Sequence, residues 1–271
     1  LPSVHQGVQC RSEGAPVLFA ADPPGIDRET RAATIDALAE LNGLQCERQG
    51  DPETLARIAQ YELAFRMHKE APEAFGIEGE SAETKKLYGI GDATTEIFGK
   101  QCLMARRLVE RGVRFVQVYS GGAHNDDNWD AHGDMMTHAP LAKNVDQPIA
   151  GLLRDLKRRG MLDDTLVIFG GEFGRTVYCQ GTLTETNYGR DHHPRCASLW
   201  MAGAGVRGGY THGETDDFGY NVARDPVHVH DLNATILHLM GVEHTRLTYR
   251  YQGRDFRLTD VHGKVVKQIL A

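Results

Sequence analysis

Three polar segments of this chain carry the residue types that bind metal ions and anions. They are SGGAHNDDNWDAHGD at 120–134, GGEFGRT at 170–176 and YGRDHHPR at 188–195. Their acidic and imidazole side chains are His124, Asp126, Asp127, Asp130, His132, Asp134, Glu172, Asp191, His192 and His193. Carboxylate oxygens and neutral imidazole nitrogens together suit a divalent ion such as zinc or manganese. The segments also contain arginines, whose guanidinium groups match the oxygens of phosphate or sulfate.

A metal ion held beside such cationic donors would stabilise the charge that develops on a transferring phosphoryl or sulfuryl group. Asp and His in glycine-rich loops are also common as turn formers that face solvent. We favour a functional cluster because three such segments occur in a chain with 13 histidines, 11 of which follow residue 120. We interpret His228, His230 and His238 instead as capping, core or surface residues.

The elements that position these segments differ between the two parts of the chain. Residues 1–92 are expected to form a helical and irregular segment packed on the core. Within it, Asp27 is expected to cap a helix, and Asp51 followed by Pro52 indicates a second helix start. The short apolar run at 17–20 is a candidate edge strand.

Residues 93–271 alternate between helical and strand patterns, which predicts an α/β core. The expected helices lie at 97–108, 145–156 and 231–240, and glycines follow the first two at Gly112 and Gly160. The expected strands lie at 113–119, 165–169 and 197–202. The apolar strands at 113–119 and 165–169 are typical of interior strands covered on both faces of a largely parallel sheet. Ligands collect at the carboxyl ends of such strands, so the loops at 120–134, 170–176 and 189–195 are expected to converge.

Composition and charge exclude several classes of protein. The 30 Lys and Arg against 37 Asp and Glu give a net charge of −7, which argues against nucleic-acid binding through a basic face. No apolar run approaches the roughly 18 residues that a membrane span needs. The five cysteines are scattered and form no C-x-x-C motif, which excludes a zinc ribbon or a dense disulfide scaffold. The chain starts at Leu1 without a signal peptide, so we expect a processed product or a fragment.

Several motifs occur in a fixed order along the chain: WDAHGD, GGEFGRT, YGRDHHP, GETDDFG and VHDLNATILHLMG. Together they resemble domain-of-unknown-function family 1501, whose members are usually labelled sulfatases and belong to the alkaline-phosphatase-like superfamily. The resemblance is most specific from Val113 to about Leu258, and the chain looks like the C-terminal portion of the family's longer members. It implies an alkaline-phosphatase-like α/β sandwich with a mostly parallel central sheet, preceded by a helical segment.

The resemblance also implies a metal centre built at strand ends, and we expect its divalent ion to be zinc, manganese or calcium. The ligands that it implies are Asp130, His132, Glu172 and His192 or His193, and the residues expected to hold anionic oxygens are Arg175 and Arg190. Phe173 stands where the superfamily has a histidine. Export to the periplasm or the cell exterior is a further expectation from the resemblance.

The superfamily's nucleophile has no counterpart in this sequence. Sulfatases convert Cys or Ser within the pattern C/S-x-P/A-x-R, and none of the five cysteines has that context. The leading hypothesis is a metal-dependent hydrolase of sulfate or phosphate esters, inactive or weakly active as this chain, with an anionic small molecule or glycan ester as substrate. The alternative is a non-catalytic binding module that uses the same cleft for an acidic glycan or a protein partner.

Overall fold

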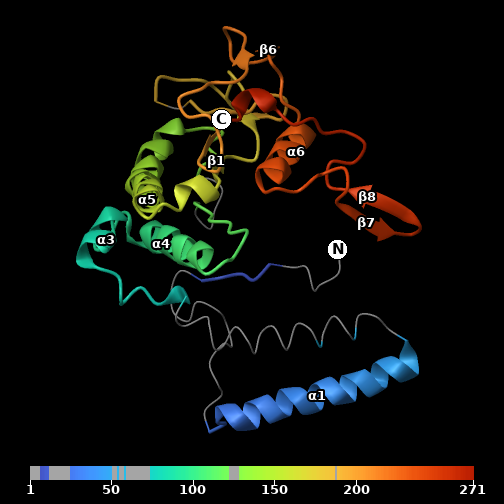
Figure 1. Ribbon diagram of the computed structural model, residues 1–271. Coiled ribbons are helices and arrows are strands. Elements are labelled where there is room, and N and C mark those ends of the chain that lie inside the picture. The colour runs from blue at the N-terminus through green and yellow to red at the C-terminus, as the bar shows by residue number, and fades with distance from the viewer. Residues whose placement is uncertain are drawn as a thin grey trace. The chain divides into compact units, whose positions relative to one another are not determined.

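The computed structural model divides the chain into two compact units, residues 1–118 and 119–271 (Figure 1). It describes residues 7–11, 25–50, 54, 58, 74–121, 128–186 and 188–271. The predicted edge strand at 17–20 and the predicted helix start at Asp51 lie outside these residues. No helix in the described part of the chain is long and apolar enough to cross a lipid bilayer.

The first unit contains the helix α1, Arg28–Gln49, which begins where the sequence predicts. The Asp27 carboxylate accepts a hydrogen bond of 2.8 Å from the backbone N–H of Thr30, and this bond satisfies one of the free N–H groups of the first turn. The helix ends at Gly50, whose φ of 68° is a left-handed conformation that glycine adopts without steric cost.

The first unit also contains α3 (Ala82–Leu87) and α4 (Glu96–Glu110), and arginines of α4 form ion pairs with Glu80, which precedes α3. Arg106 is 1% exposed and lies 2.7 Å from Glu80 and 2.6 Å from Glu110. Burial disfavours the charged form of Glu80, but hydrogen bonds from Arg107 and Arg106 outweigh it and hold its pKa below the ordinary value. Gly99 of α4 is required here, because a Cβ would overlap the carbonyl oxygen of Tyr88.

The second unit begins with the short 3-10 helix η3, Met135–Thr137, and the long helix α5, His138–Arg158. Helix α5 contains the whole predicted segment 145–156, and Gly160 follows it with a φ of 69°, as expected for a helix stop. Its buried Asp155 accepts hydrogen bonds from Arg158 and Arg159, the latter at 3.0 Å. A second 3-10 helix, η4 (Leu162–Asp164), leads from α5 into the first strand.

The strands among the described residues form four separate antiparallel pairs rather than one sheet, and they are drawn as short arrows in Figure 1. Strand β1 (Val167–Gly170) pairs with β4 (Leu199–Ala202), and β2 (Gly174–Arg175) pairs with β3 (His192–His193). The remaining pairs are β5 (Glu214–Thr215) with β6 (Val222–Arg224), and β7 (Thr248–Tyr251) with β8 (Arg254–Arg257).

The predicted alkaline-phosphatase-like sandwich with a mostly parallel central sheet is therefore wrong: the described residues form a mixed α/β fold with short antiparallel pairs. Residues 113–119 form no strand, and Phe115 and Tyr119 in this run are largely exposed. Strand β1 exists close to its predicted place, but Ile168 and Phe169 are 41% and 39% exposed, so it is not covered on both faces. Phe169 instead stacks on Trp200 of the antiparallel partner, with ring centroids 5.5 Å apart.

The last α-helix, α6 (Val229–Leu239), confirms the helix predicted at 231–240. His228 caps it by accepting a hydrogen bond from the backbone N–H of His230, and Asp231 accepts one from the N–H of His228. Asp231 and Thr235 also accept hydrogen bonds from the backbone at 264 and 266, which ties the C-terminal segment and its 3-10 helix η5 (Lys267–Ile269) to α6. His228 thus caps α6, which is one of the three roles considered for it from the sequence.

Candidate metal centre

The loop at 128–134 places Asp130 and His132 through a series of local hydrogen bonds. The side-chain oxygen of Asn128 accepts a bond of 2.9 Å from the N–H of Asp130, and the N–H of His132 donates to the Asp130 carbonyl. Trp129 anchors the loop by donating from its indole N–H to Ser120 and by contacting the His138 ring at the start of α5. The two functional side chains therefore come from a turn that is held at both ends.

Strands β2 and β3 bring the other side chains to this loop. In their antiparallel register Arg175 is the partner of His192, so both side chains lie on the same face of the pair. Gly174 permits the close approach of the segment at Cys196, because a Cβ at position 174 would overlap the carbonyl oxygen of Cys196. Successive residues of a strand point to opposite faces, so His193 points away from this cluster.

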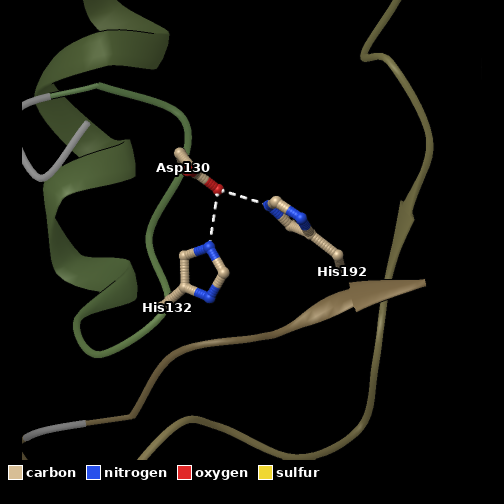
Figure 2. Close-up of side chains that lie close together, drawn as sticks. All are labelled: Asp130, His132 and His192. Carbon is tan, nitrogen blue, oxygen red and sulfur yellow. Dashed lines mark hydrogen bonds and ion pairs between the residues drawn. The ribbon is translucent and has the colours of Figure 1, made fainter. Parts of the chain in front are cut away.

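Three side chains meet at one carboxylate oxygen of Asp130. The Oδ1 atom lies 2.9 Å from Nε2 of His132, 2.7 Å from Nε2 of His192 and 2.8 Å from Nη1 of Arg175. Figure 2 shows the two imidazole rings turned toward this oxygen from different segments of the chain. Asp130, His132 and His192 each offer a ligand atom, and these atoms lie within 4.8 Å of one another. In the described part of the chain, no other group of acidic, histidine or cysteine residues meets this geometry.

The environment of Asp130 keeps its carboxylate ionised. Hydrogen bonds from His192 and Arg175, aided by electrostatic interaction with His132 and Arg175, outweigh desolvation and lower the pKa of Asp130 to about 2. A ligand carboxylate must be deprotonated before it binds a metal ion, so Asp130 needs to lose no proton at neutral pH. The side chain is 26% exposed, and the ion therefore has access to the oxygen from solvent.

The two imidazole rings are themselves held in place by neighbouring groups. Nδ1 of His132 is shielded from solvent and lies 3.1 Å from Oδ1 of Asp191, without hydrogen-bond geometry in this structure. A carboxylate behind the second nitrogen is the arrangement that orients histidine ligands in metal sites. The ring edge of Phe173 packs against His192 with centroids 4.7 Å apart, and the His192 and His132 rings lie 4.6 Å apart.

The residues predicted from sequence fall into two groups. Asp130, His132, His192 and Arg175 meet in the cluster. Glu172 is 59% exposed and, among the described residues, pairs with Arg175 rather than with the ligand atoms, with Oε1 at 3.4 Å from Nη2. His193 is buried against Tyr220, stacking on its ring at 4.5 Å and bonding to its carbonyl oxygen. Arg190 donates to the carbonyl of Gly189. The candidates His124, Asp126 and Asp127 lie outside the described residues.

Sequence reasoning placed Asp191 in a polar segment but gave it no role. Its contact with His132 depends on the backbone bonds that join residues 176 and 191: the N–H of Thr176 donates to the Asp191 carbonyl, and the N–H of Asp191 donates to the Thr176 hydroxyl. These bonds join positions 15 residues apart, so a local sequence pattern does not predict them. The sequence feature that could have indicated a role for Asp191 is its position directly before the histidine pair His192–His193.

Fold and site together define a mixed α/β protein with a candidate centre for one metal ion. Residues 1–270 match the family described as Protein of unknown function (DUF1501), and the chain belongs to that family. The resemblance drawn from the ordered motifs is confirmed at this level. Comparison with curated proteins and with solved structures gave no match.

Proposed function

We propose that Asp130, His132 and His192 bind a single divalent transition-metal ion. The observation that carries this proposal is the convergence of two imidazole nitrogens on one ionised carboxylate oxygen, with all three ligand atoms within 4.8 Å of one another. Two nitrogen ligands and one oxygen suit zinc or manganese, whereas calcium takes oxygen ligands almost exclusively. Zinc is therefore the first metal to test, and manganese is the second.

Three protein ligands leave at least one coordination position for water or substrate, which is the pattern of catalytic rather than structural zinc sites. An ion held by Asp130, His132 and His192 would lower the pKa of a bound water and supply a nucleophile near neutral pH, so hydrolysis would need no side-chain nucleophile. Arg175 lies beside the same carboxylate and can hold anionic oxygens. We therefore propose hydrolysis of phosphate or sulfate esters as the activity of this centre.

The ordered motifs and the acidic and imidazole ligand set support a link to sulfatases and to the alkaline-phosphatase-like superfamily, although the described residues lack the parallel central sheet expected from that superfamily. On the same motifs we propose that the chain corresponds to the C-terminal portion of longer family members. We also propose that the protein is exported. A small anionic ester or an acidic glycan ester is the proposed substrate. Capture of such a glycan, or of a protein partner, without turnover is the competing interpretation.

The test is zinc and manganese binding by isothermal titration calorimetry on the metal-free protein, followed by melting curves with and without the ion. The wild type is expected to bind one equivalent, and Asp130→Asn and His192→Ala are expected to lose this binding. His238→Asn is the matched control, because His238 is exposed in the last turn of α6, away from the cluster. Equal melting temperatures for all variants with and without metal would contradict the proposal.

The loaded protein is then assayed with 4-nitrophenyl phosphate and 4-nitrophenyl sulfate. Turnover that is lost in Asp130→Asn and kept in His238→Asn supports the hydrolase. Metal binding together with tight binding of an unhydrolysed acidic glycan would favour the binding module instead. The two interpretations share the metal centre, so the assay separates them without depending on which ester is natural.

A further inference from the structure

Arg175 shares an acceptor atom with both candidate imidazole ligands. Its Nη1 lies 2.8 Å from Oδ1 of Asp130, the oxygen that His132 and His192 also contact. We infer that a divalent cation displaces the Arg175 guanidinium from Asp130 and makes it available to a tetrahedral oxyanion, so that cation and oxyanion bind cooperatively. The inference rests on the proposed metal centre and adds a mechanism by which its ligands depend on one another.

Crowding at Oδ1 is the first reason for the exchange. A carboxylate oxygen has about two lone-pair directions, yet three nitrogen atoms contact this one at 2.7–2.9 Å. Both imidazoles direct their Nε2 atoms at this oxygen, and the His192 contact has hydrogen-bond geometry. A cation bound by the same imidazoles needs one of these directions, and its two positive charges repel a guanidinium a few ångströms away. The guanidinium is the contact that can leave, because it is not a metal ligand.

The structure limits where Arg175 can go. Its backbone is fixed in β2 opposite His192, and its side chain is 24% exposed, so only the guanidinium end can move. The neighbouring acceptor is Glu172, with Oε1 at 3.4 Å from Nη2, and this side chain is 59% exposed. An exposed ion pair is worth little, so Glu172 holds the released guanidinium only weakly.

A tetrahedral oxyanion at the open coordination position gives the released guanidinium a stronger partner than Glu172. Its oxygens meet the cation on one side and the guanidinium fork on the other, a charge-assisted geometry for which arginine is well suited. The coupling must be reciprocal: if the cation raises oxyanion affinity by some factor, the oxyanion raises cation affinity by the same factor. A phosphate ester, a sulfate ester and the free oxyanion all present this chemistry.

The test measures zinc and sulfate affinities by calorimetry, each with and without the other ion, because sulfate keeps zinc in solution. For the wild type we expect zinc to tighten sulfate binding by about fivefold or more, and sulfate to tighten zinc binding by the same factor. In Arg175→Gln the coupling factor should fall to about one, while zinc binding without sulfate should become tighter, because a competitor for Asp130 is gone. Arg250→Gln is the control, since Arg250 in β7 is exposed and pairs with Asp255.

Glu172→Gln provides a second variant that does not depend on the folding of Arg175→Gln. Glu172 is exposed and competes with the oxyanion for the released guanidinium, so its loss should tighten sulfate binding in the zinc-loaded protein. Weaker zinc binding by Arg175→Gln, or an unchanged sulfate affinity on zinc loading, would overturn the exchange while leaving the metal centre standing. Failure of the wild type to bind zinc would overturn the metal centre and the exchange together.

Discussion

His192 and His193 are adjacent in β3, and their side chains point to opposite faces of the β2–β3 pair. Nε2 of His192 lies 2.7 Å from Asp130, whereas His193 is 6% exposed and stacks on the Tyr220 ring. The alternation of a strand produces this division of roles. The His192 imidazole is available to a metal ion, and the His193 imidazole is packed against Tyr220.

His193→Ala is therefore expected to lower the free energy of unfolding by about 1–3 kcal/mol, because it removes a buried ring and leaves the Tyr220 carbonyl without its partner. His192→Ala, at an exposed position, is expected to change stability much less and to abolish metal binding. Urea denaturation and calorimetry on the metal-free proteins measure the two effects. Equal losses of metal binding in both variants would contradict the assignment.

The depressed pKa of Asp130 makes a prediction about acid stability. Its folded-state value of about 2 lies below the ordinary 3.8, so the ionised carboxylate stabilises the fold above the ordinary value. That contribution is lost as the pH falls through the window from about 4 to 2. Wild type and Asp130→Asn are expected to differ in melting temperature at pH 5 and to converge toward pH 2. Parallel curves across this window would show that the carboxylate has no such partners.

Asp191→Asn tests the group behind His132. The substitution keeps the oxygen that accepts from the His192 N–H at 2.9 Å but removes the charge that faces Nδ1 of His132. Metal affinity is expected to fall about 10-fold or more, with little change in the melting temperature of the metal-free protein. Asp217→Asn, at an exposed position, is the control. An unchanged metal affinity would mean that Asp191 does not support His132.

Gly174→Ala tests the backbone approach that brings β2 to its neighbours. A Cβ there would overlap the Cys196 carbonyl, so the strand pair must shift. We expect a loss of about 2 kcal/mol or more of stability, together with weaker metal binding because Arg175 and His192 lose their register. Gly208→Ala is the matched control, since a Cβ at Gly208 meets no atom within 4 Å. Comparable unfolding curves for the two variants would count against this role for Gly174.

Helix patterns could be read from the sequence because they depend on local spacing. The apolar stripes at 145–156 and 231–240 lie in α5 and α6, and Asp27 caps α1 as its residue type indicates. The apolar runs at 165–169 and 197–202 predicted strands close to the observed positions of β1 and β4. They carried no information about pairing partners, so the antiparallel contact between β1 and β4 was missed and a parallel sheet was expected in error.

The site was predictable in its chemistry and less so in its geometry. Residue types alone singled out Asp130, His132 and His192. The choice between His192 and His193 depends on the register of β2 with β3, which a histidine pair does not reveal. Glu172 followed an apolar strand, as the resemblance required, but the turn into β2 leaves it exposed beside Arg175 instead of among the ligand atoms.

X-ray absorption spectroscopy at the zinc edge of the loaded protein tests the central claim most directly. The account predicts a shell of nitrogen and oxygen atoms only, with the outer scattering of two imidazole rings, and the loss of one ring's contribution in His192→Ala. A sulfur ligand from any of the cysteines, or a spectrum unchanged by His192→Ala, would contradict a metal centre formed by Asp130, His132 and His192.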